Sequence, residues 1–155
     1  MMTTQQRLTK YGVPNEAGTY LVTVTLPFPV RIAWDKNTSV RKIRVHKQIA
    51  EPILKVFKQI FDHYGYERIK ELGIDIYAGV FNFRKMRNGN NWSAHAWGLA
   101  IDLDPERNGL KTPWAKSQFS KPEYAPMIKA FYDHGFINLG AEKGFDSMHF
   151  EWKGN

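Results

Sequence analysis

The chain of 155 residues contains no cysteine. A closed structural zinc site made of thiolates is therefore excluded. Any metal site would have to use histidine and carboxylate side chains, which the chain does contain. The absence of cysteine is compatible with either a reducing or an oxidising place of action.

The sequence also lacks a long apolar run. No apolar segment follows the positive charges of the N-terminus, MMTTQQRLTK, so no secretory signal is predicted, and no stretch is long enough to cross a bilayer. We therefore expect a soluble monomer that is made in the cytoplasm and does not insert into a membrane. The length predicts one domain, residues 1–155, with a single core, and residues 1–18 are predicted to form an irregular N-terminal arm with a short helical turn at 3–11.

Acidic residues are outnumbered by basic ones, 15 against 22, which gives a net charge of +7. Such an excess favours polyanionic partners, namely nucleic acid, an anionic membrane or the bacterial wall. Five Trp and seven Tyr could stack on bases, but no basic repeat, zinc knuckle or recognised nucleic-acid motif accompanies them. Nucleic acid is therefore the less favoured partner.

Hydrophobic periodicity predicts both strands and helices in the first half of the chain. Residues 19–25 and 30–34 are predicted as two strands around a proline-bearing turn, because proline is tolerated at strand ends and turns. Residues 46–64 have helical periodicity, with the helix beginning near Glu51 or kinked at Pro52. His46 and His63 have no acid or histidine partner at a metal-binding spacing and are predicted to be surface residues.

The second half continues this mixture. A further helical turn is predicted at 67–72, a strand at 74–81, and strands at 136–139 and 148–152. Ser120 and Glu123 have the spacing of a capping box for a helix that reaches His134. The predicted fold class is α+β, an antiparallel sheet that carries a functional site on one face and packs helices on the other.

The first segment with candidate functional residues is 93–104, SAHAWGLAIDLD, which offers His95 and Asp102 as metal ligands. From residue 99 onward apolar and other side chains alternate, as in a half-buried strand. An unbroken strand would place His95 and Asp102 on opposite faces, since they are seven residues apart. Gly98 lies between them and can provide the bend that turns both inward. An edge strand with solvated acids is the alternative.

A second histidine follows in residues 145–152, FDSMHFEW, where His149 and Glu151 alternate with apolar neighbours. Two neutral imidazoles and one carboxylate form a common catalytic zinc set that leaves the fourth position to water. Asp146 precedes His149 by three residues and would lie in the turn before the strand. There it could accept a proton from the attacking water, which is an arrangement suited to a peptidase.

The two motifs, Ser-x-His-x-x-Gly-x-Ala-x-Asp and Asp-x-x-His-Phe-Glu, resemble those of the zinc peptidases that include D-Ala-D-Ala carboxypeptidases, D-Ala-D-Ala dipeptidases and phage L-alanyl-D-glutamate endopeptidases. The resemblance covers about residues 79–152. It implies the hedgehog and D-Ala-D-Ala peptidase fold. It also implies one zinc ion per chain bound by His95, Asp102 and His149, with Asp146 as the general base.

The resemblance also implies an arginine that faces the substrate carbonyl. Arg84 is the first candidate and Arg87 the alternative, and a fixed guanidinium there would stabilise the developing oxyanion. Both arginines could instead be solvated loop cations. Ser93 is expected to position the site through a hydrogen bond, and Glu151 to support the ligands from outside or to face solvent.

The expected function is zinc-dependent hydrolysis of the stem peptide of peptidoglycan. We expect a phage endolysin-type L-alanyl-D-glutamate endopeptidase that acts on the wall after release at lysis. A D-alanyl-D-alanine carboxypeptidase is the alternative enzyme. A basic wall-binding or nucleic-acid-binding protein with a structural metal is the alternative of another class.

Overall fold

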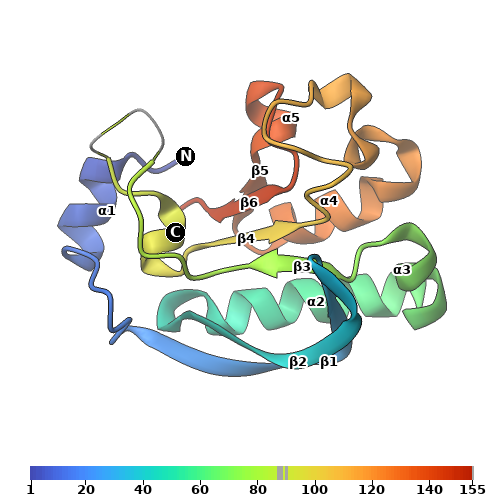
Figure 1. Ribbon diagram of the computed structural model, residues 1–155, viewed down its shortest axis with the longest axis horizontal. Helices are drawn as coiled ribbons and strands as arrows, with labels where there is room; N and C mark the ends of the chain where they lie inside the picture. The colour runs from blue at the N-terminus through green and yellow to red at the C-terminus, as the bar shows by residue number, and fades with distance from the viewer. Residues whose placement is uncertain (87–88, 90, 155) are drawn as a thin grey trace.

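The computed structural model describes residues 1–86, 89 and 91–154, and its centre is a six-stranded sheet (Figure 1). The strand order is β2-β1-β3-β4-β6-β5. β1 and β3 are parallel, and the other neighbouring strands are antiparallel. The predicted α+β class is confirmed. The strands are β1 (Leu21–Ile32), β2 (Asp35–His46), β3 (Ile76–Gly79), β4 (Ala100–Leu103), β5 (Phe136–Asn138) and β6 (His149–Trp152).

Helices α2 and α4 pack against each other and against the sheet (Figure 1). The inward face of α2 buries four apolar side chains almost completely, which are Ile53, Val56, Phe57 and Ile60. Each such side chain contributes roughly 1.5–3 kcal/mol on removal from water. Within the described residues, no helix is both long and apolar enough to cross a membrane. The helices are α1 (Thr4–Tyr11), α2 (Ala50–Tyr64), α3 (Tyr66–Leu72), α4 (Ala125–Asp133) and α5 (Leu139–Lys143).

The short helical turn predicted at residues 3–11 of the N-terminal arm is present as α1, Thr4–Tyr11. A capping box starts this helix: the Thr3 hydroxyl accepts from the Gln6 N–H, and the Gln6 side chain accepts from the Thr3 N–H. Arg7 is only 5% exposed. The N-terminal segment is therefore packed against the domain.

The prediction of two separate strands at 19–25 and 30–34 is also wrong, because β1 runs continuously through Pro27 and Pro29. The register with β2 shifts between Thr25 and Val30, so both prolines lie where β1 leaves the ladder. Their missing N–H groups therefore cost no ladder hydrogen bond with β2. The partner strand β2 is an edge strand whose first half is exposed, and it has no apolar alternation there by which to predict it.

Helix α2 begins close to its predicted start, whereas α4 does not. The helix predicted at 46–64 is confirmed from Ala50, with Pro52 in its first turn. The capping box predicted at Ser120 is wrong: the Ser120 hydroxyl donates to the Ser117 carbonyl, and α4 begins only at Ala125 after two short 3-10 turns. Lys121 is extended, as the residue before a proline prefers, and this interrupts the helix.

The prediction that His46 is a surface residue is wrong, because His46 is only 4% exposed. Its ring stacks on Tyr20 with the centroids 5.3 Å apart, and its Nδ1 accepts from the Gln48 N–H at 2.9 Å. Burial, with a smaller contribution from the charge of Lys47, lowers the pKa of His46 to about 4. The folded protein therefore keeps this ring neutral well below its ordinary pKa.

We predict that His46 makes the fold acid-sensitive. The folded pKa lies below the ordinary value of 6.5, so the contribution of the neutral ring is complete above that value and is lost as the pH falls toward 4. The full loss is on the order of 3 kcal/mol. Urea unfolding at neutral and mildly acidic pH should show a larger loss of stability for the wild type than for His46→Gln. Equal losses would contradict this role.

Candidate metal centre

The backbone brings the candidate ligands together from three places. Asp102 on β4 and His149 on β6 are directly opposed in the antiparallel register. His95 lies in the 3-10 turn Ala94–Trp97, which precedes β4. This turn ends at Gly98 with φ of 71°, and a Cβ there would meet a Leu21 methyl carbon at 2.5 Å. The bend predicted at Gly98 is therefore present and requires glycine.

His95, Asp102 and His149 form one compact cluster. Each offers a ligand atom, and these atoms lie within 4.8 Å of one another. Nε2 of His95 and Nδ1 of His149 are each 3.2 Å from an oxygen of Asp102. Both histidines are buried, and Asp102 is half-buried. Two imidazole nitrogens and one carboxylate oxygen thus converge on one point.

A backbone carbonyl fixes the protonation of the His95 ring. Its Nδ1 is 2.7 Å from the carbonyl oxygen of Val80. A carbonyl only accepts, so Nδ1 carries the proton and Nε2 is left with a lone pair. Although Nε2 is close to Asp102, the geometry is not that of a hydrogen bond, and Nε2 is buried without a partner.

The His149 ring is held by a carboxylate on each side. Its Nε2 is 2.8 Å from Oε1 of Glu151, while its Nδ1 faces Oδ1 of Asp102. Burial alone would lower the pKa of His149, but the hydrogen bonds to Asp102 and Glu151 raise it. Burial would likewise raise the pKa of Asp102, but the charge of His95 and the hydrogen bond with His149 lower it. The cluster therefore favours a positive charge at its centre, which either a proton or a metal ion can supply.

The residues fit a zinc ion. Zinc accepts two imidazole nitrogens and one carboxylate oxygen and leaves a fourth position open in catalytic sites. A histidine that binds a metal commonly donates its other N–H to a carbonyl or carboxylate, as His95 donates to Val80 and His149 to Glu151. The unpartnered Nε2 of His95 is the buried polar atom that such an ion would satisfy.

Asp146 lies beside the cluster in a strained turn. Its φ is 63°, unusual for a residue other than glycine, and its carbonyl accepts from the His149 N–H. Burial raises the pKa of Asp146, against the attraction of the nearby His149. Oδ1 is buried without a hydrogen-bond partner, so it is free to accept a proton from water or substrate. Its assignment as the general base stays a prediction.

The remaining site candidates differ in position. The Ser93 hydroxyl accepts from the His95 N–H at 3.2 Å and caps the turn that carries this ligand. Glu151 is buried and contacts His149 rather than solvent. Arg84 is exposed on the segment after β3, and its role toward a substrate stays a prediction. Arg87 lies outside the described residues.

Two contributors were not predicted from the sequence. Val80 acts through its backbone carbonyl, which no side-chain motif can indicate. Arg7 donates to Glu151 from a position 144 residues away. The helical turn that carries Arg7 was predicted, but its contact with Glu151 was not.

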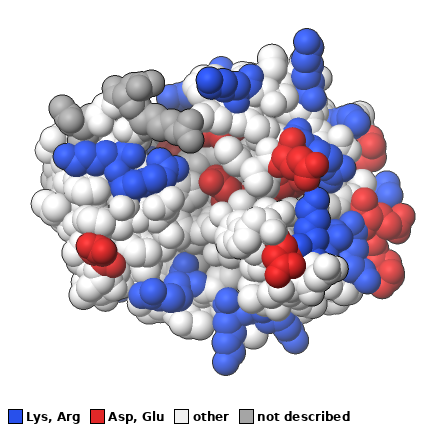
Figure 2. Space-filling view, viewed as in Figure 1, with Lys and Arg blue, Asp and Glu red and all other residues white. Residues whose placement is uncertain are grey.

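The surface charge on the face drawn in Figure 2 is uneven. Figure 2 shows a small acidic area near the middle of the face, and side chains of both charge signs, most of them Lys and Arg, around its edge. The chain as a whole carries a net charge of +7. A cation would therefore be attracted to the middle of a protein that is basic overall.

Residues 87–152 match the family model described as D-alanyl-D-alanine carboxypeptidase. The match covers less than half of the chain, so it shows that this segment is similar to that family. It contains the three clustered residues and Asp146, so the resemblance predicted from the motifs is confirmed over it, and the first 86 residues lie outside the match. The family implies a metallopeptidase hydrolase with a peptidoglycan peptide as substrate. No curated protein and no solved structure matched the chain.

We predict that the purified protein binds about one zinc ion per chain through this three-ligand site. Asp102→Ala and His149→Ala should each lose the ion on dialysis, because two ligands no longer hold it. His63→Ala is the matched control, since His63 is an exposed histidine on α2. Elemental analysis measures all four proteins, and full zinc content in both ligand variants would refute the site.

Proposed function

We propose that the protein is a zinc-dependent peptidase that cleaves the stem peptide of peptidoglycan. The observation that carries this proposal is the buried cluster of His95, Asp102 and His149 with the unpartnered Oδ1 of Asp146 beside it. The family match over residues 87–152 supports the substrate class. A site built only to bind a metal structurally has no need of a free carboxylate oxygen next to an open coordination position.

Each residue has a separate role in the proposed reaction. His95, His149 and Asp102 hold the ion, and bound zinc supplies Lewis acidity that polarises the peptide carbonyl and makes water more acidic. Asp146 accepts the proton of the attacking water and returns it to the leaving amine. Arg84 is proposed to approach the carbonyl oxygen from the exposed loop and to stabilise the developing negative charge.

We propose the bond between L-Ala and D-Glu as the one cleaved. A carboxypeptidase needs a fixed cation for the terminal carboxylate of its substrate, whereas an endopeptidase does not. Among the described residues, Arg7 is the one buried Lys or Arg, and its guanidinium is already paired with Glu151. This favours cleavage within the stem rather than at its end.

D-alanyl-D-alanine carboxypeptidase activity is the second candidate, because the matching family model carries that description. In this case an exposed cation, such as Arg84, would have to close over the terminal carboxylate. The two activities predict different products from the same substrate. They can therefore be separated in one experiment.

Incubation of zinc-loaded protein with purified peptidoglycan, followed by mass spectrometry, tests the function and locates the bond. We expect stem peptides released with a new amino terminus at D-Glu. Loss of terminal D-Ala alone would replace the proposal by the carboxypeptidase. Absence of any new fragment would favour a binding protein with a structural metal.

We predict that Asp146→Asn separates proton transfer from metal binding. The variant keeps the size of the side chain but loses the base, so turnover should fall by about two to four orders of magnitude. Zinc content should remain at the wild-type level, since Asp146 is not one of the three clustered ligands. A variant that keeps wild-type turnover would show that another group takes the proton.

A further inference from the structure

Arg7 lies outside the family-matched segment, yet it reaches the metal site. Its Nη2 donates to Oε2 of Glu151 at 2.6 Å, and both side chains are only 6% exposed. The other oxygen of Glu151 accepts from Nε2 of His149 at 2.8 Å. A continuous path of charge-assisted hydrogen bonds therefore leads from α1 to the ring whose Nδ1 faces Asp102.

Stability alone does not explain the buried ion pair of Arg7 and Glu151. Removing two charges from water costs about as much as their attraction returns, and apolar side chains of similar size are often as stabilising in such a position. The α1 surface could have been joined to β6 by apolar contacts at lower cost. The buried Arg7–Glu151 pair is therefore better explained by its effect on the His149 ring, which Glu151 holds.

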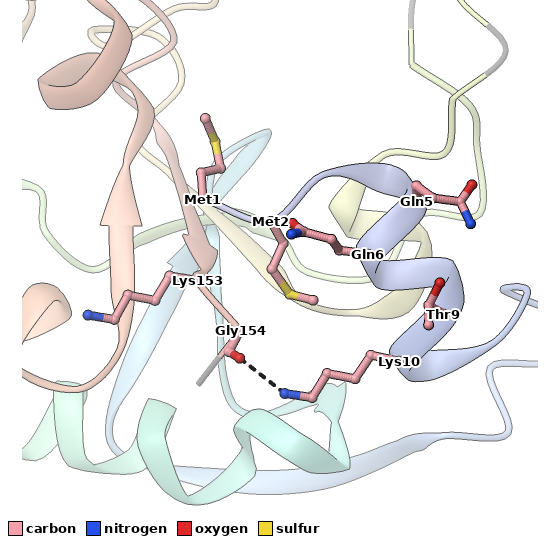
Figure 3. Close-up of a pocket in the computed structure, with 8 residues that line it drawn as sticks. All are labelled: Met1, Met2, Gln5, Gln6, Thr9, Lys10, Lys153 and Gly154. Atoms are coloured by element: carbon pink, nitrogen blue, oxygen red, sulfur yellow. Dashed lines mark hydrogen bonds between the residues drawn. The ribbon is translucent and has the colours of Figure 1, made fainter.

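Other contacts dock α1 without Arg7. The Thr4 hydroxyl donates to the Trp92 carbonyl, and the indole Nε1 of Trp97 donates to the carbonyl of Gly12 just after the helix. Figure 3 shows α1 beside the segment that follows β6, where Lys10 Nζ donates to the Gly154 carbonyl at 3.0 Å. Helix α1 and the residue after it thus contact the region of the His95 turn and the segment that follows β6, and loss of the Arg7 guanidinium leaves these contacts in place.

We infer that Arg7 is a positioning residue of the metal site, an inference that rests on the proposed function. Arg7 holds Glu151 so that the carboxylate accepts a hydrogen bond from Nε2 of His149. The Nδ1 lone pair then points to the metal position. Without Arg7, the carboxylate of Glu151 loses the partner of its Oε2 and turns toward solvent, so its hold on His149 weakens. Loss of such an outer partner typically costs about 10- to 100-fold in metal affinity.

The experiment compares zinc dissociation constants, measured by competition with a chelating dye, for the wild type and Arg7→Met. We expect binding weaker by about 10- to 100-fold in Arg7→Met and a partial recovery in Arg7→Lys. Lys10→Met is the matched control on the same helix and should bind zinc as the wild type does. The absorption spectrum of the cobalt-substituted proteins reports the same change at the ligands, which a loss of helix docking alone would not produce.

Double substitution tests whether Arg7 acts through Glu151. If it does, Arg7→Met combined with Glu151→Gln should bind zinc no more weakly than Glu151→Gln alone. The double variant also removes the unpaired buried charge, so it should fold even if Arg7→Met does not. Additive losses, or wild-type affinity in Arg7→Met, would overturn the inference while the proposed function stands. A wild type that binds no zinc would overturn both.

Discussion

The imidazole of His149 lies between two carboxylates, and the rest of the site depends on this arrangement. Asp102 faces Nδ1 and Glu151 faces Nε2, so the ring cannot rotate without losing both partners. The antiparallel register of β4 and β6 supplies the geometry, because it places Asp102 opposite His149 and Ala100 opposite Glu151. A register slip of one residue would turn these side chains to the other face of the sheet. The sheet therefore fixes the site as well as the core.

Elements outside β4 and β6 hold the other groups of the site in place. The turn at Gly98 returns His95 to the cluster, and the Val80 carbonyl after β3 determines which nitrogen of that ring is free. Helix α1 contributes Arg7, which forms the buried ion pair with Glu151. Each histidine is thus held through its outer nitrogen, and the inner nitrogens are left for a metal ion.

The parts of this structure that follow from short-range pattern were predictable. Alternation in β4 and β6 placed Asp102 and His149 on the face opposite the core, because the strand period is local. Contacts between distant segments were not: nothing near Arg7 indicates a partner 144 residues away. Edge strand β2 lacks apolar alternation over its exposed half, and the effect of Pro122 on Lys121 overrode the expected helix cap at Ser120.

A crystal structure of the zinc-loaded protein, with anomalous scattering measured at the zinc absorption edge, tests the central claim most directly. The account predicts one zinc ion bound by Nε2 of His95, Nδ1 of His149 and an oxygen of Asp102, with zinc to nitrogen distances of about 2.0–2.1 Å. Glu151 should still accept from Nε2 of His149. Zinc located elsewhere, or bound through Nε2 of His149 with Glu151 displaced, would contradict the account.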